Sequence, residues 1–354
     1  MDSDKCLERL FRYASEYKFR DFSDRFAELA PQFPAEALRD AHLIAAQIKL
    51  FAADETLLDD LEKIAEIEGP PRFPCLSECW LPDSPNRFIV FKKTRGAVRD
   101  FLQNLPRVEE LLSRWYAEAG ASMARQVRSE VLYFSGAFEE ARRLAEKQLE
   151  KSRERRADAI PAQYVRFRCC LAMGLGEEAE ACMLDMIRMA RVHPECLGPY
   201  RVVRDWANLT TGWSGDTPRF CEVPDGGAQP VLEDRLAAIR TGISRLSPLE
   251  EPFVEYAERE YGEAYTVRQY YMDIFHALYW FQVGDPGQAE AHFMRAYQIS
   301  VASDLVMPFV EYGSQIIPLL RHIEGGSTVC SQEWIARIRS LAEGYEQSLH
   351  EYRG

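Results

Sequence analysis

Apolar residues recur at every third or fourth position along most of the chain, which is the spacing of amphipathic helices. The pattern predicts helices over residues 7–17, 21–30, 35–51, 55–67, 94–118 with a bend near Pro106, 309–321 with a kink at Pro318, and 333–352. The one candidate for a strand is the short run 88–91. The sequence therefore predicts an all-α fold.

Three segments repeat one local pattern, in which a helix is followed by a glycine and then by a helix with small residues at regular spacing. In each segment an alanine lies five residues after the glycine: Ala141 after Gly136, Ala179 after Gly174, and Ala289 after Gly284. We expect the glycine to end the first helix in a left-handed conformation and the alanine to let the second helix pack closely. This pattern is typical of a tetratricopeptide-like repeat.

The repeat spacing also predicts what lies between these segments. The first helices of the three pairs are expected over 125–134, 159–173 and 269–282. The 110 positions from Ala179 to Ala289 leave room for two more units with degenerate signatures. Their helices are expected over 200–211, 231–246 and 252–262, whereas the breaker-rich stretch 212–230 is predicted to be a long loop.

The N-terminal part is less regular than the rest of the chain. Its helices alternate with short polar or proline breaks, and the stretch 69–86 contains five prolines. We therefore expect two regions. Residues 1–93 form an irregular helical region with a proline-rich loop at 69–88, and residues 94–354 form a tetratricopeptide-like superhelix, an α-solenoid.

Charge and cysteine usage narrow the functional classes. The chain has 43 basic and 56 acidic residues, a formal net charge of −13, so its surface repels the phosphate backbone of nucleic acids. No apolar run approaches the roughly 20 residues that cross a bilayer, and the acidic N-terminus is unlike a secretory signal. The nine cysteines have no regular spacing, which is typical of reduced thiols in the cytoplasm.

No catalytic, cofactor or metal motif occurs in the chain. It lacks the phosphate-binding G-x-x-x-x-G-K-[ST] loop, the H-E-x-x-H metal pair and the G-x-S-x-G nucleophile elbow. Cys75 and Cys79 form a close pair without a second pair at zinc-site spacing, and His276 lies in an apolar helix that favours a core histidine. We expect no enzyme, although an enzyme built without a known motif stays an alternative.

Three stretches carry a resemblance to a known family. Residues 129–136 followed by Glu140 and Ala141 resemble its repeat, as do residues 276–284 through Ala289. Most specific is 302–313, which ends in Pro-Phe-Val-Glu-Tyr-Gly and is followed by Ile-Pro-Leu-Leu at 317–320. These stretches resemble the helical-repeat sensor region of the large LuxR-type, MalT-like transcription regulators.

In that family an ATPase domain precedes the superhelix and a helix-turn-helix follows it. Neither has a counterpart in this sequence. The resemblance therefore implies the sensor part of a longer regulator, which meets DNA only through a missing C-terminal domain. It also implies a small-molecule effector or a protein partner, or self-association of the regulator.

In a stacked array the first helix of each pair lines the concave face, and exposed polar or aromatic residues there are the candidates for binding. Counting back from each glycine, these residues are Gln126, Glu130, Tyr133, Tyr164, Arg168 and Tyr271. As a set they suit a sugar or a peptide, held by stacking and hydrogen bonds. Two alternatives stay open: the residues pack against neighbouring helices, or the chain is an interaction scaffold without a small ligand.

Overall fold

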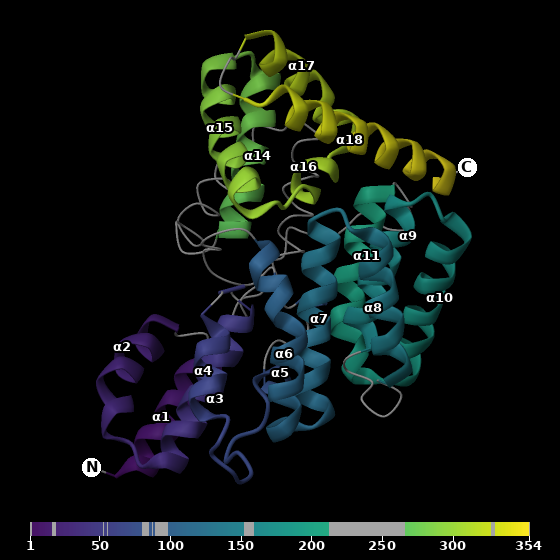
Figure 1. Cartoon of the computed structure of the whole chain (residues 1–354). Coiled ribbons are helices and arrows are strands. Elements are labelled where there is room, and N and C mark those ends of the chain that lie inside the picture. The colour runs from purple at the N-terminus through teal and green to yellow at the C-terminus, as the bar shows by residue number, and fades with distance from the viewer. Residues whose placement is uncertain are drawn as a thin grey trace, which may run out of the picture.

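The computed structural model describes residues 2–15, 19–51, 53–54, 56–79, 85–86, 88, 98–151, 159–211, 266–326 and 330–353. Within these ranges the chain is helical and contains no strand (Figure 1). The all-α fold class predicted from the sequence is therefore confirmed. None of the described helices is both long and apolar enough to cross a membrane.

The N-terminal helices form a group of their own at one end of the molecule (Figure 1). They are α1 (Ser3–Ser15), α2 (Phe19–Leu29), α3 (Ala35–Phe51), α4 (Leu57–Ile64) and the short α5 (Leu76–Cys79). The helix α3 is buried along most of its length because α1 and α4 pack against it. Its Arg39 holds the start of the proline-rich stretch by donating to the carbonyls of Glu68 and Pro70, both at 2.8 Å.

Three helix pairs carry the repeats that the sequence predicts. They are α7 (Glu118–Phe134) with α8 (Phe138–Lys151), α9 (Ala159–Ala172) with α10 (Gly176–Val192), and α14 (Thr266–Val283) with α15 (Pro286–Ser303). The two helices of each pair lie side by side (Figure 1). Before the first pair α6 (Val98–Tyr116) packs on α7, and after the second pair α11 (Leu197–Thr211) packs on α9 and α10.

The turn inside each pair has the conformation that the glycine spacing predicts. Gly136, Gly174 and Gly284 have φ angles of 84°, 72° and 92°. After each glycine an N–H reaches back five residues to a carbonyl, the bond of a Schellman cap: Ala137 to Leu132, Leu175 to Cys170, and Asp285 to Trp280. The alanine five residues past each glycine is fully buried. Both parts of the local prediction are confirmed.

Most predicted helices are shifted at their ends by a few residues, and two differ from the prediction by more. The first helix of the first pair begins at Glu118, seven residues before the expected start, directly after Ala117 turns the chain with φ 48°. The predicted helix 309–321 with a kink at Pro318 is wrong. The structure instead has α16 (Met307–Val310), a 3-10 turn and α17 (Ile317–Gly326), because the chain breaks around Gly313 at φ 51° and Pro318 falls in the first turn of α17.

Several predictions fall on residues outside the described ranges. These are the loop 212–230, the helices 231–246 and 252–262, and the boundary between residues 93 and 94. Of the strand candidate 88–91, only residue 88 is described.

The C-terminal helix α18 (Gln332–Arg353) agrees with the predicted helix 333–352 and packs on elements far away in the sequence. It contacts α16 and α17 beside it, and also α9, α10 and α11 (Figure 1). In addition, α16 packs on α7, and the Val306 N–H donates to the Phe134 carbonyl at 2.8 Å. The last third of the described chain therefore returns onto the first two pairs.

The glycine turns generate a stability prediction. Gly284→Ala meets open space, so its cost is backbone strain alone, about 1–2 kcal/mol of unfolding free energy. Gly136→Ala is expected to cost more, because its Cβ would lie 3.3 Å from the Val306 Cγ2. The matched control is Gly344→Ala inside α18, which also meets open space and should stabilise by about 1 kcal/mol. Urea unfolding measures all three; equal effects at Gly284 and Gly344 would contradict the argument.

Candidate functional site

The structure brings the six predicted residues together but does not expose them. Gln126, Glu130 and Tyr133 lie on α7, Tyr164 and Arg168 lie on α9, and Tyr271 lies on α14; every one is buried, with at most 5% of its surface exposed. The expectation that they lie exposed on a concave face is therefore wrong. With Asn86, Phe88, Phe134 and Glu311 they form one interior group, which we call the Arg168 cluster.

The guanidinium of Arg168 lies at the centre of this cluster. Its central carbon is 4.1 Å from the ring centre of Tyr164, 4.4 Å from that of Tyr133 and 5.3 Å from that of Phe134. Such distances allow cation–π attraction, which is strongest where water is excluded. The Nη2 donates to the Asn86 Oδ1 at 2.7 Å, whereas the Nε has no hydrogen-bond partner among the described residues.

Neighbouring oxygens keep this buried guanidinium charged. Burial opposes the charge, but the hydroxyl oxygens of Tyr164 and Tyr133 and the carboxylate of Glu311 outweigh it and raise the pKa of Arg168. The cluster therefore holds a permanent positive charge in the interior of the molecule.

The Glu311 carboxylate joins helices that lie far apart in the sequence. Its Oε1 accepts from the Tyr133 hydroxyl at 2.7 Å, and its Oε2 accepts from the Tyr271 hydroxyl at 3.0 Å. Burial, and next the negative charge of Glu311, raise the pKa of Tyr133, so this phenol stays protonated and able to donate. One acidic side chain thus connects α7, α14 and the turn that follows α16.

Glu130 provides a second buried carboxylate. Its Oε2 accepts from the backbone N–H of Phe88 at 2.6 Å, and its Oε1 accepts from the Gln126 Nε2 at 2.6 Å. The Phe88 ring lies 6.0 Å from the Phe134 ring, between centres. Asn86 and Phe88 therefore enter the cluster through an amide side chain, a main-chain contact and an aromatic ring.

Sequence reasoning missed Asn86, Phe88 and Glu311. Glu311 carried a signal, because it is the acidic residue of an apolar run from Leu305 to Tyr312, and an acid in such a run needs buried donors. Asn86 and Phe88 carried none, because they follow a proline-rich stretch whose contacts do not depend on helical periodicity.

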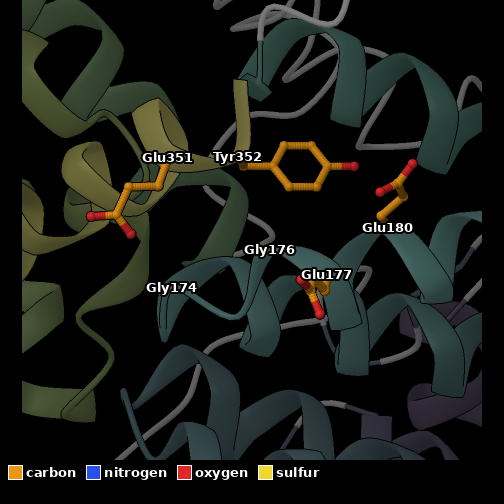
Figure 2. A pocket seen from close by; sticks show the side chains of 6 residues that line it. All are labelled: Gly174, Gly176, Glu177, Glu180, Glu351 and Tyr352. Atoms are coloured by element: carbon orange, nitrogen blue, oxygen red, sulfur yellow. The ribbon is translucent and has the colours of Figure 1, made fainter. Parts of the chain in front are cut away.

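Two cavities lie outside the Arg168 cluster. One, of about 400 Å³, is lined by Gly174, Gly176, Glu177, Glu180, Glu351 and Tyr352. Figure 2 shows Tyr352 reaching from the end of α18 toward Glu180 on α10. The other, of about 290 Å³, is lined by Lys5, Cys6, Arg9, Leu10, Tyr13, Arg25 and Leu29. The first lining is acidic and the second is apolar with a basic edge.

Across the described ranges, no three His, Cys, Asp or Glu side chains gather to hold a metal ion. Cys75 is buried and its thiol donates to the Gln47 Oε1 at 3.3 Å, whereas the side chain of Cys79 lies outside the described part.

His276 is buried, as the sequence predicts, and stacks on His292 with ring centres 4.6 Å apart. The His292 Nδ1 lies 3.1 Å from the Asp273 Oδ1, which also accepts from the Arg295 Nε at 2.9 Å. Burial, and next the charge of His292, lower the pKa of His276 to about 4. At neutral pH His276 is therefore an uncharged core histidine.

Comparison with known proteins assigns no family. No protein-family model matches the chain, and no curated protein matches it. The function therefore has to be argued from the residues of the Arg168 cluster.

The Glu311 contacts generate a second prediction. Tyr133→Phe leaves a buried carboxylate with one donor fewer, so we expect a loss of about 1–3 kcal/mol in unfolding free energy. The control is Tyr13→Phe, whose hydroxyl accepts from Arg9 at the surface and whose loss should cost less than about 0.5 kcal/mol. Urea unfolding compares them; similar costs at both positions would show that Glu311 does not depend on its tyrosines.

The depressed pKa of His276 generates a pH prediction. Its pKa is about 4 when folded and 6.5 when free, so the unfolded chain binds more protons between these values. Its contribution to stability is complete above pH 6.5 and is lost as the pH falls toward 4, by on the order of 2 kcal/mol between pH 7 and 5. His276→Gln should remove this part of the pH dependence, and His350→Gln at the surface should keep it. Unfolding curves at pH 7, 6 and 5 measure the difference.

Proposed function

We propose that the chain is a signal-sensing or partner-binding module of a LuxR-type transcription regulator, with its helix pairs arranged as a tetratricopeptide-like superhelix. It binds a small effector or a partner at the Arg168 cluster. The observation that carries this proposal is the convergence of the six candidate residues with Glu311 in one interior group.

The composition of the cluster supports a binding role. A core does not need a buried guanidinium and two buried carboxylates for its stability, because apolar residues of similar volume in place of the whole group often stabilise it as well or better. Charged groups between aromatic faces are instead the usual means of orienting a ligand in an apolar site. The set suits an effector that offers hydroxyl or carboxylate oxygens to Arg168 and a flat face to Tyr133 and Tyr164.

The position of the cluster supports a signalling role. Tyr133 on α7 and Tyr271 on α14 share the Glu311 carboxylate, although long stretches of sequence separate them. A ligand that competes for this carboxylate or for Arg168 changes how the first and third pairs are joined. Binding then shifts an equilibrium between two arrangements of the helices, as a sensor requires.

The resemblance supports the wider context. The Pro-Phe-Val-Glu-Tyr-Gly motif supplies Glu311, so the most specific part of the resemblance lies in the cluster. Under this proposal the module works in the cytoplasm and leaves DNA binding to a separate domain. Its formal charge of −13 suits that division, because the module itself avoids phosphate backbones.

The second candidate is an interaction scaffold without a small ligand. The observation that favours it is the filling of the cluster by the chain's own Asn86 and Phe88, both almost fully buried. In that case the cluster only fixes the arrangement of the pairs, and partners meet the outer helices.

A thermal-shift screen of sugars, amino acids and other metabolites tests the proposal. A ligand at 100 times its Kd should stabilise the chain by about 2.7 kcal/mol, which raises the Tm by several degrees. Arg168→Lys should abolish the shift, because a point charge replaces the planar guanidinium between the tyrosines. Arg188→Lys on the outer side of α10 is the control that keeps the shift.

The scaffold would give another result. No metabolite would shift the Tm, and light scattering would show an oligomer that grows with protein concentration.

A further inference from the structure

We propose that α7 and α9 form a peptide-binding site for an Asn-x-Phe motif, and that the chain's own Asn86 and Phe88 occupy this site as a tethered ligand. The inference deepens the proposed function and rests on it, because it names the class of partner that the Arg168 cluster takes. A partner peptide with the same motif would bind by replacing the tethered residues.

The main chain of the tethered residues is held by a charge. The Glu130 carboxylate, fully buried on α7, accepts from the Phe88 N–H at 2.6 Å. Hydrogen bonds from a backbone N–H to a carboxylate are stronger than neutral ones. The contact requires only a peptide bond from its occupant, so it is equally open to a partner.

The side chain of Asn86 is held by a second charge. Its Oδ1 accepts from the Arg168 Nη2 at 2.7 Å, and Asn86 has no exposed surface. The planar guanidinium is fixed by the rings of Tyr133 and Tyr164. A fixed donor of this kind selects a side-chain oxygen acceptor at one place along the occupant, and the asparagine of the tethered segment supplies it.

The side chain of Phe88 supplies the apolar anchor. It is 1% exposed and its ring lies 6.0 Å from Phe134. Phe134 also contacts the Arg168 guanidinium, so the aromatic and amide positions are built on the same side chains. Asparagine and phenylalanine two residues apart therefore meet adjacent positions that share Phe134.

Scaffold proteins commonly bind peptides through main-chain hydrogen bonds together with sites for particular side chains, and both kinds of contact occur here. The contacts with Glu130, Phe134 and Arg168 join residues 42, 46 and 82 positions apart, so local chain geometry does not impose them. A tethered ligand has an effective concentration in the millimolar range, which weakens the apparent affinity for any free competitor. A partner peptide must therefore bind tightly enough, or be concentrated enough, to displace the tethered residues.

Fluorescence anisotropy tests the proposal with a labelled peptide of residues 83–90, Asp-Ser-Pro-Asn-Arg-Phe-Ile-Val. The full chain is compared with its Asn86→Ala/Phe88→Ala variant, in which the tethered ligand is disabled. We expect the variant to bind the peptide about tenfold or more tighter than the unmodified chain. A control peptide with alanine at the Asn and Phe positions should not bind, and adding Glu130→Gln to the variant should remove binding.

Equal weak binding of both peptides, or equal affinity of the chain and its folded variant, would overturn the proposal. If circular dichroism shows that the variant does not fold, hydrogen exchange on the unmodified chain decides instead. Millimolar peptide should speed exchange of the Phe88 amide, while the control peptide leaves it unchanged. No difference between the peptides overturns the proposal.

The result also separates this inference from the proposed function. If a metabolite raises the Tm through Arg168 but no peptide binds, the peptide-site proposal is contradicted and the sensor proposal is supported. Failure of both would leave the cluster as a packing device.

Discussion

The structure depends on a buried carboxylate that two phenols share. Glu311 accepts from Tyr133 and Tyr271, and so ties the first helix pair to the last one described. A carboxylate away from water needs such donors, because leaving it unpaired costs several kcal/mol. The pairs cannot separate without exposing it or leaving it unsatisfied. The same constraint fixes the tyrosine beside Arg168, and therefore the position of the guanidinium.

Local features of this fold were predictable because they follow from single turns of chain. The glycines that end α7, α9 and α14 have positive φ, and the alanines five residues later are buried, as their spacing predicts. The break around Gly313 was missed because the apolar pattern continues through it, and only the chain's need to turn back toward α7 and α18 decides against a continuous helix. Periodicity reports which face is buried but not where a tertiary contact interrupts it.

Only the part of the candidate site that lies on the first helices of the pairs is predictable from the sequence, because it follows from helical spacing. Counting along the first helices selected residues that share one face, and these do meet. The repeat spacing does not show what covers that face, so it predicts that these residues are exposed. In the structure Asn86, Phe88 and Glu311 cover them. The resemblance carried Glu311 within its motif but gave it no role. Contacts between residues 42 to 178 positions apart lie beyond any local pattern.

The return of α18 onto α9, α10 and α11 has a consequence for how the molecule is made. In an open array of repeats each helix pair contacts only its neighbours. Its apolar surface is therefore covered as soon as the next pair has been synthesised. Here the part of α9 and α10 that α18 contacts stays uncovered until residues 332–353 have left the ribosome. At ordinary elongation rates of about 5–20 residues per second, the 139 residues between α10 and α18 represent on the order of ten seconds. During that interval the nascent chain exposes this part of its apolar surface, and the exposure is a property of its topology.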